Sequence, residues 1–190
     1  MRISEADILF ISGLGGSGRD HWQTRWADKM ANGRTVDLPN PGHPVCDHWV
    51  EAIIAEIAAC ENPVLLVAHS LGSLAVAHAM QSFQTRGSRG DRHPVSGAFL
   101  VAPPSARALG AIGAIDPAFA PPPSAPLPFP ALVIASSDDP YATRDETENM
   151  ALDWGAQVVD AGAAGHINAE SGHGPWPEGL MRLATFLKRL

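Results

Sequence analysis

The feature that most constrains the fold is a short apolar run that ends at a serine. Residues 64–67 read V-L-L-V, and residues 68–72 read A-H-S-L-G. An unbroken apolar run of this length is typical of a strand buried on both faces of a parallel sheet. A helix-forming run over residues 74–80 follows almost at once. We therefore predict a buried strand that turns sharply at Ser70 into a helix.

Ser70 has two interpretations at this point. The pattern resembles the nucleophile elbow G-x-S-x-G, in which small residues flank the serine because the strand and helix backbones come close together. Ala68 replaces the first glycine and still meets the steric demand, and Gly72 meets it fully. An elbow would aim the N–H of Leu71 at a developing oxyanion. The alternative is a helix N-cap, where serine is favoured because its oxygen accepts a hydrogen bond from the first turn.

A glycine-rich loop follows the first predicted strand. Residues 13–18 read G-L-G-G-S-G, a spacing that differs from the dinucleotide-binding fingerprint G-x-G-x-x-G. No acidic residue ends a second strand at the place that this fingerprint requires. We interpret the loop instead as the source of a second oxyanion donor, the N–H of Leu14. Candidates for the pocket lining are Gly13, Gly15, Ser17 and His69, with Asp20 and His21 also bordering the loop.

Strands and helices alternate along the chain. The apolar pattern predicts strands over residues 6–12, 34–38, 64–67, 97–102, 131–136 and 157–160, and helices over residues 20–32, 48–60, 74–80, 143–154 and 177–190. Alternation of this kind is typical of a doubly wound α/β fold, with a mostly parallel six-stranded sheet and helices on both faces. With 190 residues, the chain is expected to form one domain.

Two segments of the chain are predicted to be irregular. Residues 85–94 form a polar surface loop. Residues 103–130 are rich in proline, alanine and glycine, which excludes a long helix. The second segment is interpreted either as a cover over a site or as a stiff connection.

Three predicted strands are followed by polar side chains that together suggest catalysis. Ser70 follows the third strand, Asp138 and Asp139 the fifth, and His166 the sixth. Because the carboxyl ends of parallel strands share one edge, we expect these side chains to meet. An imidazole activates a serine hydroxyl by taking its proton, and a carboxylate fixes the tautomer of that imidazole. The alternative interpretations are that the two aspartates only stabilise a turn and that His166 is an ordinary histidine in a surface loop.

The order Ser, Asp, His along the chain is that of the α/β-hydrolases. The catalytic hypothesis is therefore a triad of Ser70, Asp139 and His166. Asp138 is interpreted as a brace for its own loop, and His173 as a brace for the loop after His166.

Composition and charge exclude several other function classes. The formal net charge is −7 and the basic residues form no cluster, so we expect no nucleic-acid partner. No apolar run approaches the roughly 20 residues that span a bilayer, and the first residues lack the basic start of a signal peptide. We therefore expect no membrane association and a cytoplasmic location. Cys46 and Cys60 are interpreted as free thiols, and we expect neither a metal site nor a cofactor.

Several motifs resemble those of a known family. S-S-D-D-P-Y at residues 136–141, G-H-I-N at 165–168 and S-G-H-G-x-W-P-E-G at 171–179 are similar to the small serine hydrolases related to the retinoblastoma-binding serine hydrolases. The resemblance covers nearly the whole chain. It implies a minimal α/β-hydrolase fold without a large lid domain, as a single domain over residues 1–190.

The resemblance also implies a site and an activity. Matching the motifs residue by residue gives Ser70, Asp139 and His166 as the triad. The implied activity is that of a carboxylesterase-like serine hydrolase, acting through an acyl-enzyme on a small acyl substrate of the ester type. The alternative hypothesis is a catalytically weak or inert hydrolase-fold module that binds a protein, because fold does not fix function. The sequence identifies no such protein partner.

Overall fold

The computed structural model describes residues 3–85 and 94–190, so most of the surface loop predicted over residues 85–94 lies outside the described residues. Within these ranges six strands form one sheet in the order β2-β1-β3-β4-β5-β6. The strands are β1 (Asp7–Ile11), β2 (Gly33–Thr35), β3 (Val64–His69), β4 (Val95–Val101), β5 (Ala131–Ala135) and β6 (Gln157–Asp160). Every neighbouring pair is parallel, which confirms the predicted sheet.

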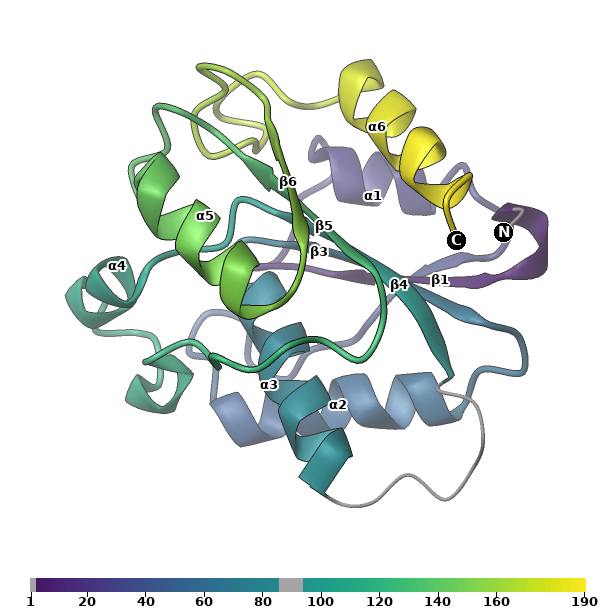
Figure 1. The fold of residues 1–190 in the computed structure, drawn as a ribbon, viewed down its shortest axis with the longest axis horizontal. Helices are drawn as coiled ribbons and strands as arrows, with labels where there is room; N and C mark the ends of the chain where they lie inside the picture. The colour runs from purple at the N-terminus through teal and green to yellow at the C-terminus, as the bar shows by residue number, and fades with distance from the viewer. Residues whose placement is uncertain (1–2, 86–93) are drawn as a thin grey trace.

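Helices cover both faces of this sheet (Figure 1). They are α1 (Trp22–Ala27), α2 (Cys46–Ala58), α3 (Leu71–Thr85), α4 (Ala106–Ala111), α5 (Arg144–Asp153) and α6 (Pro177–Leu187). Side chains of α1 and α6 belong to the buried cluster on one face, and side chains of α2, α3 and α5 belong to the cluster on the other. The doubly wound arrangement is therefore confirmed. No large additional domain interrupts it in the described part of the chain.

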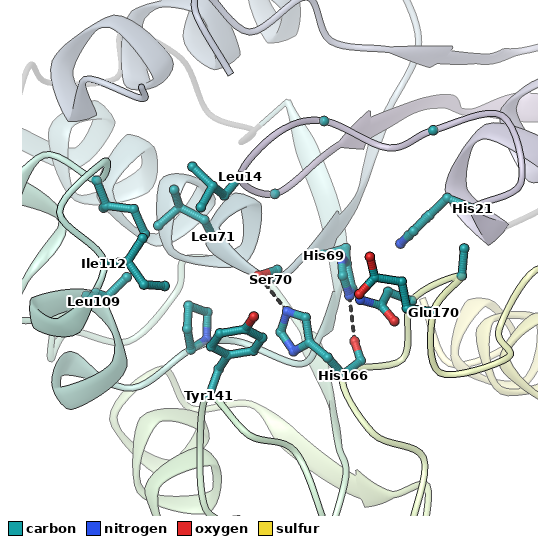
Figure 2. A pocket seen from close by; sticks show the side chains of 17 residues that line it. Leu14, His21, His69, Ser70, Leu71, Leu109, Ile112, Tyr141, His166 and Glu170 are labelled. Carbon is teal, nitrogen blue, oxygen red and sulfur yellow. Dashed lines mark hydrogen bonds between the residues drawn. The ribbon is translucent and has the colours of Figure 1, made fainter. Parts of the chain in front are cut away.

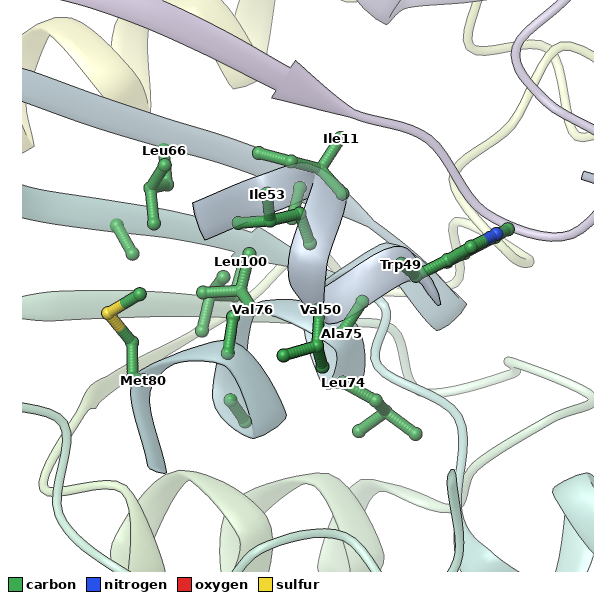
Figure 3. Close-up of a cluster of buried hydrophobic side chains, with 14 of the residues drawn as sticks. Ile11, Trp49, Val50, Ile53, Leu66, Leu74, Ala75, Val76, Met80 and Leu100 are labelled. Carbon is green, nitrogen blue, oxygen red and sulfur yellow. The ribbon is translucent and has the colours of Figure 1, made fainter. Parts of the chain in front are cut away.

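The central strands are buried on both faces, which explains their unbroken apolar runs. All six side chains of β3 are buried. Because successive side chains of a strand point to opposite faces, Leu65 packs in the cluster with α1 and α6 while Leu66 packs in the other. Figure 3 shows the cluster on the face covered by α2, α3 and α5, which includes Trp49 and Ile53 of α2 together with strand and α3 side chains. Strand β3 is thus a rigid base for the turn that follows it.

The carboxyl ends of the parallel strands share one edge of the sheet, and the loops there carry the predicted site residues. These loops are the glycine-rich loop after β1, the turn at Ser70 after β3, and the segments that follow β5 and β6. After β4, residues 103–130 contain only short helical pieces, α4 and the 3-10 helix η2 (Pro117–Phe119), as their proline content predicts. The remaining 3-10 helix is η1 (Ile3–Glu5). Among the described helices, none combines the length and apolar character that crossing a membrane requires.

Candidate active site

Ser70 occupies the sharp turn between β3 and α3. Its φ of 54° lies in the left-handed region, which a non-glycine residue adopts at a cost on the order of 1–3 kcal/mol. The turn is held on both sides, because Ser70 N donates to the carbonyl of Val101 at 2.9 Å and Ser70 O accepts from Ser73 N at 2.9 Å. The local structure is therefore a strained strand-to-helix turn rather than an ordinary helix start.

The two small residues that flank Ser70, Ala68 and Gly72, meet different steric constraints. A Cβ on Gly72 would lie 2.5 Å from the carbonyl oxygen of Ser12 and 2.6 Å from that of Ile11, so only glycine fits. Ala68 is fully buried inside β3, in register with Ile11 and Leu100. The sheet therefore accommodates alanine where the usual motif has glycine.

Ser70, His166 and Asp139 form a continuous hydrogen-bonded chain. The Oγ of Ser70 lies 2.8 Å from Nε2 of His166 (Figure 2). The Nδ1 of His166 lies 3.0 and 2.9 Å from the two carboxylate oxygens of Asp139. Because a carboxylate can only accept, Nδ1 carries the proton, and Nε2 is left free to accept from the serine hydroxyl. The side chains of His166 and Asp139 are only 10% and 3% exposed, so water screens this pair little.

Asp138 braces the loops that carry this chain of residues. Its Oδ1 accepts hydrogen bonds from Gly165 N at 2.7 Å and from Ser136 Oγ at 2.9 Å. The bond from the Gly165 N–H, followed by that from Ser136, lowers the pKa of Asp138 because both favour the carboxylate. The carboxylate thus holds its own loop through Ser136 and, beyond the predicted brace of that loop, ties it to the loop of His166 through Gly165.

The loop after His166 is braced by its own residues as well. His173 donates its backbone N–H to Asn168 O at 2.9 Å, and its Nδ1 lies 3.2 Å from Ser171 Oγ. This geometry agrees with the bracing role predicted for His173.

His69 packs beside His166, and His21 packs in turn beside His69. The Nε2 of His69 donates to the backbone oxygen of His166 at 2.8 Å, and the two rings are 4.9 Å apart. The ring of His21 lies 4.8 Å from that of His69. Burial lowers the pKa of His21 to about 4 and places the pKa of His69 well below its usual value. Both rings are therefore neutral near pH 7, and His69 helps to fix the loop that carries His166.

A cavity of about 330 Å³ opens beside Ser70. Its lining is made of Gly13, Leu14, Gly16, Gly18, His21, His69, Ser70, Leu71, Pro104, Leu109, Ile112, Ile115, Tyr141, His166, Asn168, Ala169 and Glu170. The segment over residues 103–130, whose role the sequence left open, forms one wall of this cavity through α4 and the residues after it.

Of the residues considered for the pocket lining, Gly13, His21 and His69 line the cavity, but Gly15, Ser17 and Asp20 do not. The N–H of Gly15 donates to Pro41 O at 2.7 Å, which holds this residue against the loop after β2. The hydroxyl of Ser17 donates to Gln23 Oε1 at 2.7 Å and so turns toward α1. Asp20 pairs with Arg25 at 2.7 Å in an exposed position. The lining of this cavity therefore leaves out Gly15 and Ser17, although both were candidates for it.

Sequence reasoning did not single out Tyr141 as a site residue. Its ring lies edge-on to that of His166 at 4.5 Å, and its N–H donates to Asp139 Oδ1 at 2.9 Å. Its position two residues after the predicted catalytic Asp139 is the sequence feature that could have indicated a place in the site. Leu109, Ile112 and Ile115 were also missed, because apolar residues in a proline-rich segment show no regular period.

The two predicted oxyanion donors lie beside Ser70. Leu71 is the first residue of α3, so its N–H has no acceptor within the helix. Leu14 belongs to the glycine-rich loop, which approaches so closely that a Cβ on Gly13 would lie 2.8 Å from the Cβ of Ser70. Both leucines line the cavity (Figure 2). Their N–H groups are thus the candidates for stabilising negative charge near the serine.

The described residues were also compared with the requirements of metal and thiol sites. Over residues 3–85 and 94–190, no group of three His, Cys, Asp or Glu side chains is arranged to hold a metal ion. Cys46 and Cys60 are both free thiols. Burial raises the pKa of Cys46 to about 12, which leaves this thiol protonated and unreactive near pH 7.

Comparisons with known proteins show which sequences and folds this chain is similar to. The sequence profile of the serine hydrolase family matches residues 8–185. A YdeN-like hydrolase from Pectobacterium atrosepticum is 33% identical, with a TM-score of 0.81 over 97% of this chain and 92% of its own. No curated protein matches the chain significantly.

Two more distant structures share the fold alone. The ydeN gene product of B. subtilis is 21% identical, with a TM-score of 0.76 over 97% of this chain and 99% of its own. The esterase RhEst1 from a Rhodococcus species is 17% identical, with a TM-score of 0.61 over 99% and 90% of the two chains. The sheet and its helices are therefore those of an α/β-hydrolase fold.

Proposed function

Because the chain belongs to the serine hydrolase family, we propose that it hydrolyses small esters through an acyl-enzyme on Ser70. The observation that carries this proposal is the continuous chain from Ser70 Oγ through His166 to the Asp139 carboxylate, with each contact between 2.8 and 3.0 Å. A serine hydroxyl next to a correctly oriented imidazole is the arrangement that acyl transfer needs.

The first half of the reaction acylates the serine. Ser70 Oγ forms a bond to the ester carbonyl carbon while its proton passes to His166 Nε2. The tetrahedral intermediate collapses, the bond to the leaving oxygen breaks, and His166 gives its proton to the departing alcohol. Asp139 keeps its negative charge throughout and stabilises the imidazolium that forms between the two proton transfers.

The second half returns the enzyme to its starting state. His166 Nε2 takes a proton from water while the water oxygen bonds to the acyl carbon. The bond to Ser70 Oγ then breaks, and the serine regains its proton from His166. The balance is one ester and one water consumed, and one carboxylic acid and one alcohol released. In both halves the N–H groups of Leu71 and Leu14 would donate to the oxyanion.

The cavity supports a small acyl group as the substrate. A volume of about 330 Å³ lies at the lower end of the range for small-molecule sites. Leu109, Ile112 and Ile115 supply an apolar wall beside the serine.

A fluorophosphonate probe tests this proposal, because it reacts only with an activated serine. We expect stoichiometric labelling of the wild type and turnover of p-nitrophenyl acetate, with both lost in Ser70→Ala. Ser124→Ala is the matched control, since Ser124 is exposed and outside the cavity lining. Folded wild type that resists the probe, with Ser70→Ala equally active, would overturn the proposal and favour the inert binding module.

A further inference from the structure

The cavity has two chemically different halves with Ser70 at the boundary between them. Figure 2 shows these halves on either side of Ser70, the apolar one lined by Leu14, Leu71, Leu109 and Ile112 and the polar one by His21, His69 and Glu170. An ester whose carbonyl carbon is held at Ser70 extends an acyl arm and an alcohol arm in different directions. One of these arms therefore meets the polar half.

His21 contributes an unused hydrogen-bond donor to the polar half. The residue is only 6% exposed, and its Nδ1 accepts a hydrogen bond from Gln23 N at 3.2 Å. Because Nδ1 is the acceptor, the neutral ring carries its proton on Nε2. This Nε2 is buried and has no hydrogen-bond partner among the described residues. Leaving a buried donor unpaired costs free energy, so an acceptor that reaches this N–H group would be bound more tightly.

The surroundings of His21 define which acceptor suits it. Its ring is held in place 5.4 Å from that of Trp22 and 4.8 Å from that of His69. Burial, together with the charge of a protonated His166, keeps the pKa of His21 near 4, so the ring stays neutral during catalysis. Glu170 lines the same half, and a carboxylate there disfavours a second anionic group nearby. A neutral oxygen therefore suits this position better than a carboxylate or a phosphate.

We propose that the Nε2–H of His21 binds a neutral oxygen acceptor, such as an ether, carbonyl or hydroxyl oxygen, on the substrate arm that enters the polar half. His21 is thus a specificity-determining residue. It favours esters that combine one apolar arm with one oxygen-bearing arm over esters that are apolar throughout. The inference rests on the proposed function, because it requires an ester seated on Ser70.

Two pairs of isosteric esters test this inference, each differing by an ether oxygen in place of one methylene. p-Nitrophenyl 3-methoxypropanoate against p-nitrophenyl pentanoate places the oxygen on the acyl arm. 2-Methoxyethyl acetate against butyl acetate places it on the alcohol arm. Each kcat/KM is divided by the rate constant for alkaline hydrolysis of the same ester. This division corrects for the difference in intrinsic reactivity between the two esters of a pair. We expect the wild type to prefer the oxygen-bearing member of one pair by about 3- to 10-fold, the effect of one net hydrogen bond.

Variants of His21 then connect that preference to the Nε2–H group. His21→Asn keeps an acceptor for the N–H of Gln23, because asparagine is a favoured N-cap. Its amide N–H groups lie on a shorter side chain, so the variant has no donor at the Nε2 position. His21→Gln places an amide donor close to the original Nε2 position. The readout is the rate ratio within a pair, which a general loss of stability does not move. We expect the preference to vanish in His21→Asn and to survive in part in His21→Gln.

The possible outcomes separate this inference from the proposed function. Equal corrected rates within both pairs for the wild type would overturn the inference, and this comparison needs no variant to fold. An unchanged preference in His21→Asn would overturn it as well. In both cases hydrolysis that depends on Ser70 would persist, so the proposed function would stand. If none of the four esters is hydrolysed in a Ser70-dependent manner, the proposed function itself fails.

Discussion

Asp138 and Asp139 are neighbours in the chain, yet their carboxylates serve different groups. Asp139 contacts the Nδ1 of His166, and Asp138 accepts from the backbone N–H of Gly165. Turn chemistry suits both residues equally, so the choice of Asp139 from the sequence depended on its place directly before a predicted turn and helix. The structure separates the two by the direction in which each side chain points.

Paired substitutions test this division of roles at the residue scale. Asp139→Asn removes the charge that stabilises the imidazolium and allows the wrong tautomer of His166, so we expect kcat to fall by about 10³- to 10⁴-fold. Asp138→Asn retains an oxygen that can accept from Gly165, so we expect a loss of no more than about 10-fold from weakened bracing. Steady-state kinetics with p-nitrophenyl acetate measure both. Equal losses in the two variants would contradict the assignment.

Individual site residues were predictable where a local pattern determines them. Ser70 follows from the strand, the small neighbours and the helix-forming run around it. Gly15 and Ser17 were misplaced because their positions depend on partners elsewhere in the chain, Pro41 and Gln23. The burial of the His21 Nε2 without a hydrogen-bond partner, as far as the described ranges go, depends on packing in three dimensions, which the sequence does not reveal.

The turn between β3 and α3 is the element on which the site is built. It brings α3 so close to β1 that Gly72 lies against the carbonyl groups of Ile11 and Ser12. The same close approach places the glycine-rich loop against Ser70. The geometry of the nucleophile is thus set by the packing of two strands and a helix, all of them predicted from the apolar pattern.

Gly72→Ala tests the steric requirement of this turn. The added Cβ would collide with backbone oxygens, which cannot rotate away, so we expect a destabilisation of about 1–3 kcal/mol or more. Displacement of Ser70 should lower kcat/KM as well. Gly42→Ala is the control, because a Cβ there meets nothing within 4 Å and the φ is not positive. Thermal unfolding and ester hydrolysis measure the pair, and a fully stable, active Gly72→Ala would contradict the steric account.

Helix boundaries were predicted less well than the presence of the helices. A helix was expected over residues 20–32, but α1 covers only Trp22–Ala27 and the chain then continues as turns. Trp22 and Trp26 still share one buried face, as their spacing of four predicted. Helix α4 was not predicted, because its six residues are too few to show a period. Its start is fixed instead by Ser105, whose oxygen accepts from Ala108 N at 3.3 Å.

At the scale of the whole molecule, the parallel sheet explains why residues almost 100 positions apart meet. Because all six described strands run the same way, the segments that follow β3, β5 and β6 leave the sheet at one edge. That arrangement could be predicted from the alternation of strands and helices. The shape of the cavity could not, because the path of residues 103–130 over the site has no local signature.

The buried histidines should make the stability of the folded protein depend on pH. His21 and His69 have pKa values below 6.5 in the folded state, mainly because of burial. As pH falls from about 6.5 toward 4, the unfolded chain binds protons that the folded chain does not, so the free energy of unfolding decreases. The bonded carboxylates, such as Asp138, lose their contribution only at lower pH.

Urea denaturation at pH 7.5 and pH 5 measures this effect. We expect the wild type to be less stable at pH 5, and His21→Asn to show a smaller difference between the two values because one buried histidine is gone. Each unit of pKa difference corresponds to about 1.4 kcal/mol. A stability that is constant or rises as the pH falls over this interval would show that these histidines are not buried as neutral rings.

The most direct test of the central claim is to identify the covalent intermediate. Wild-type protein is mixed with p-nitrophenyl acetate, quenched in acid during the first turnover, and digested for peptide mass analysis. We predict one acetyl group on the peptide that contains Ser70, a matching burst of p-nitrophenol, and neither signal in Ser70→Ala. An acetyl group confined to another residue, or a burst that persists in Ser70→Ala, would contradict the account.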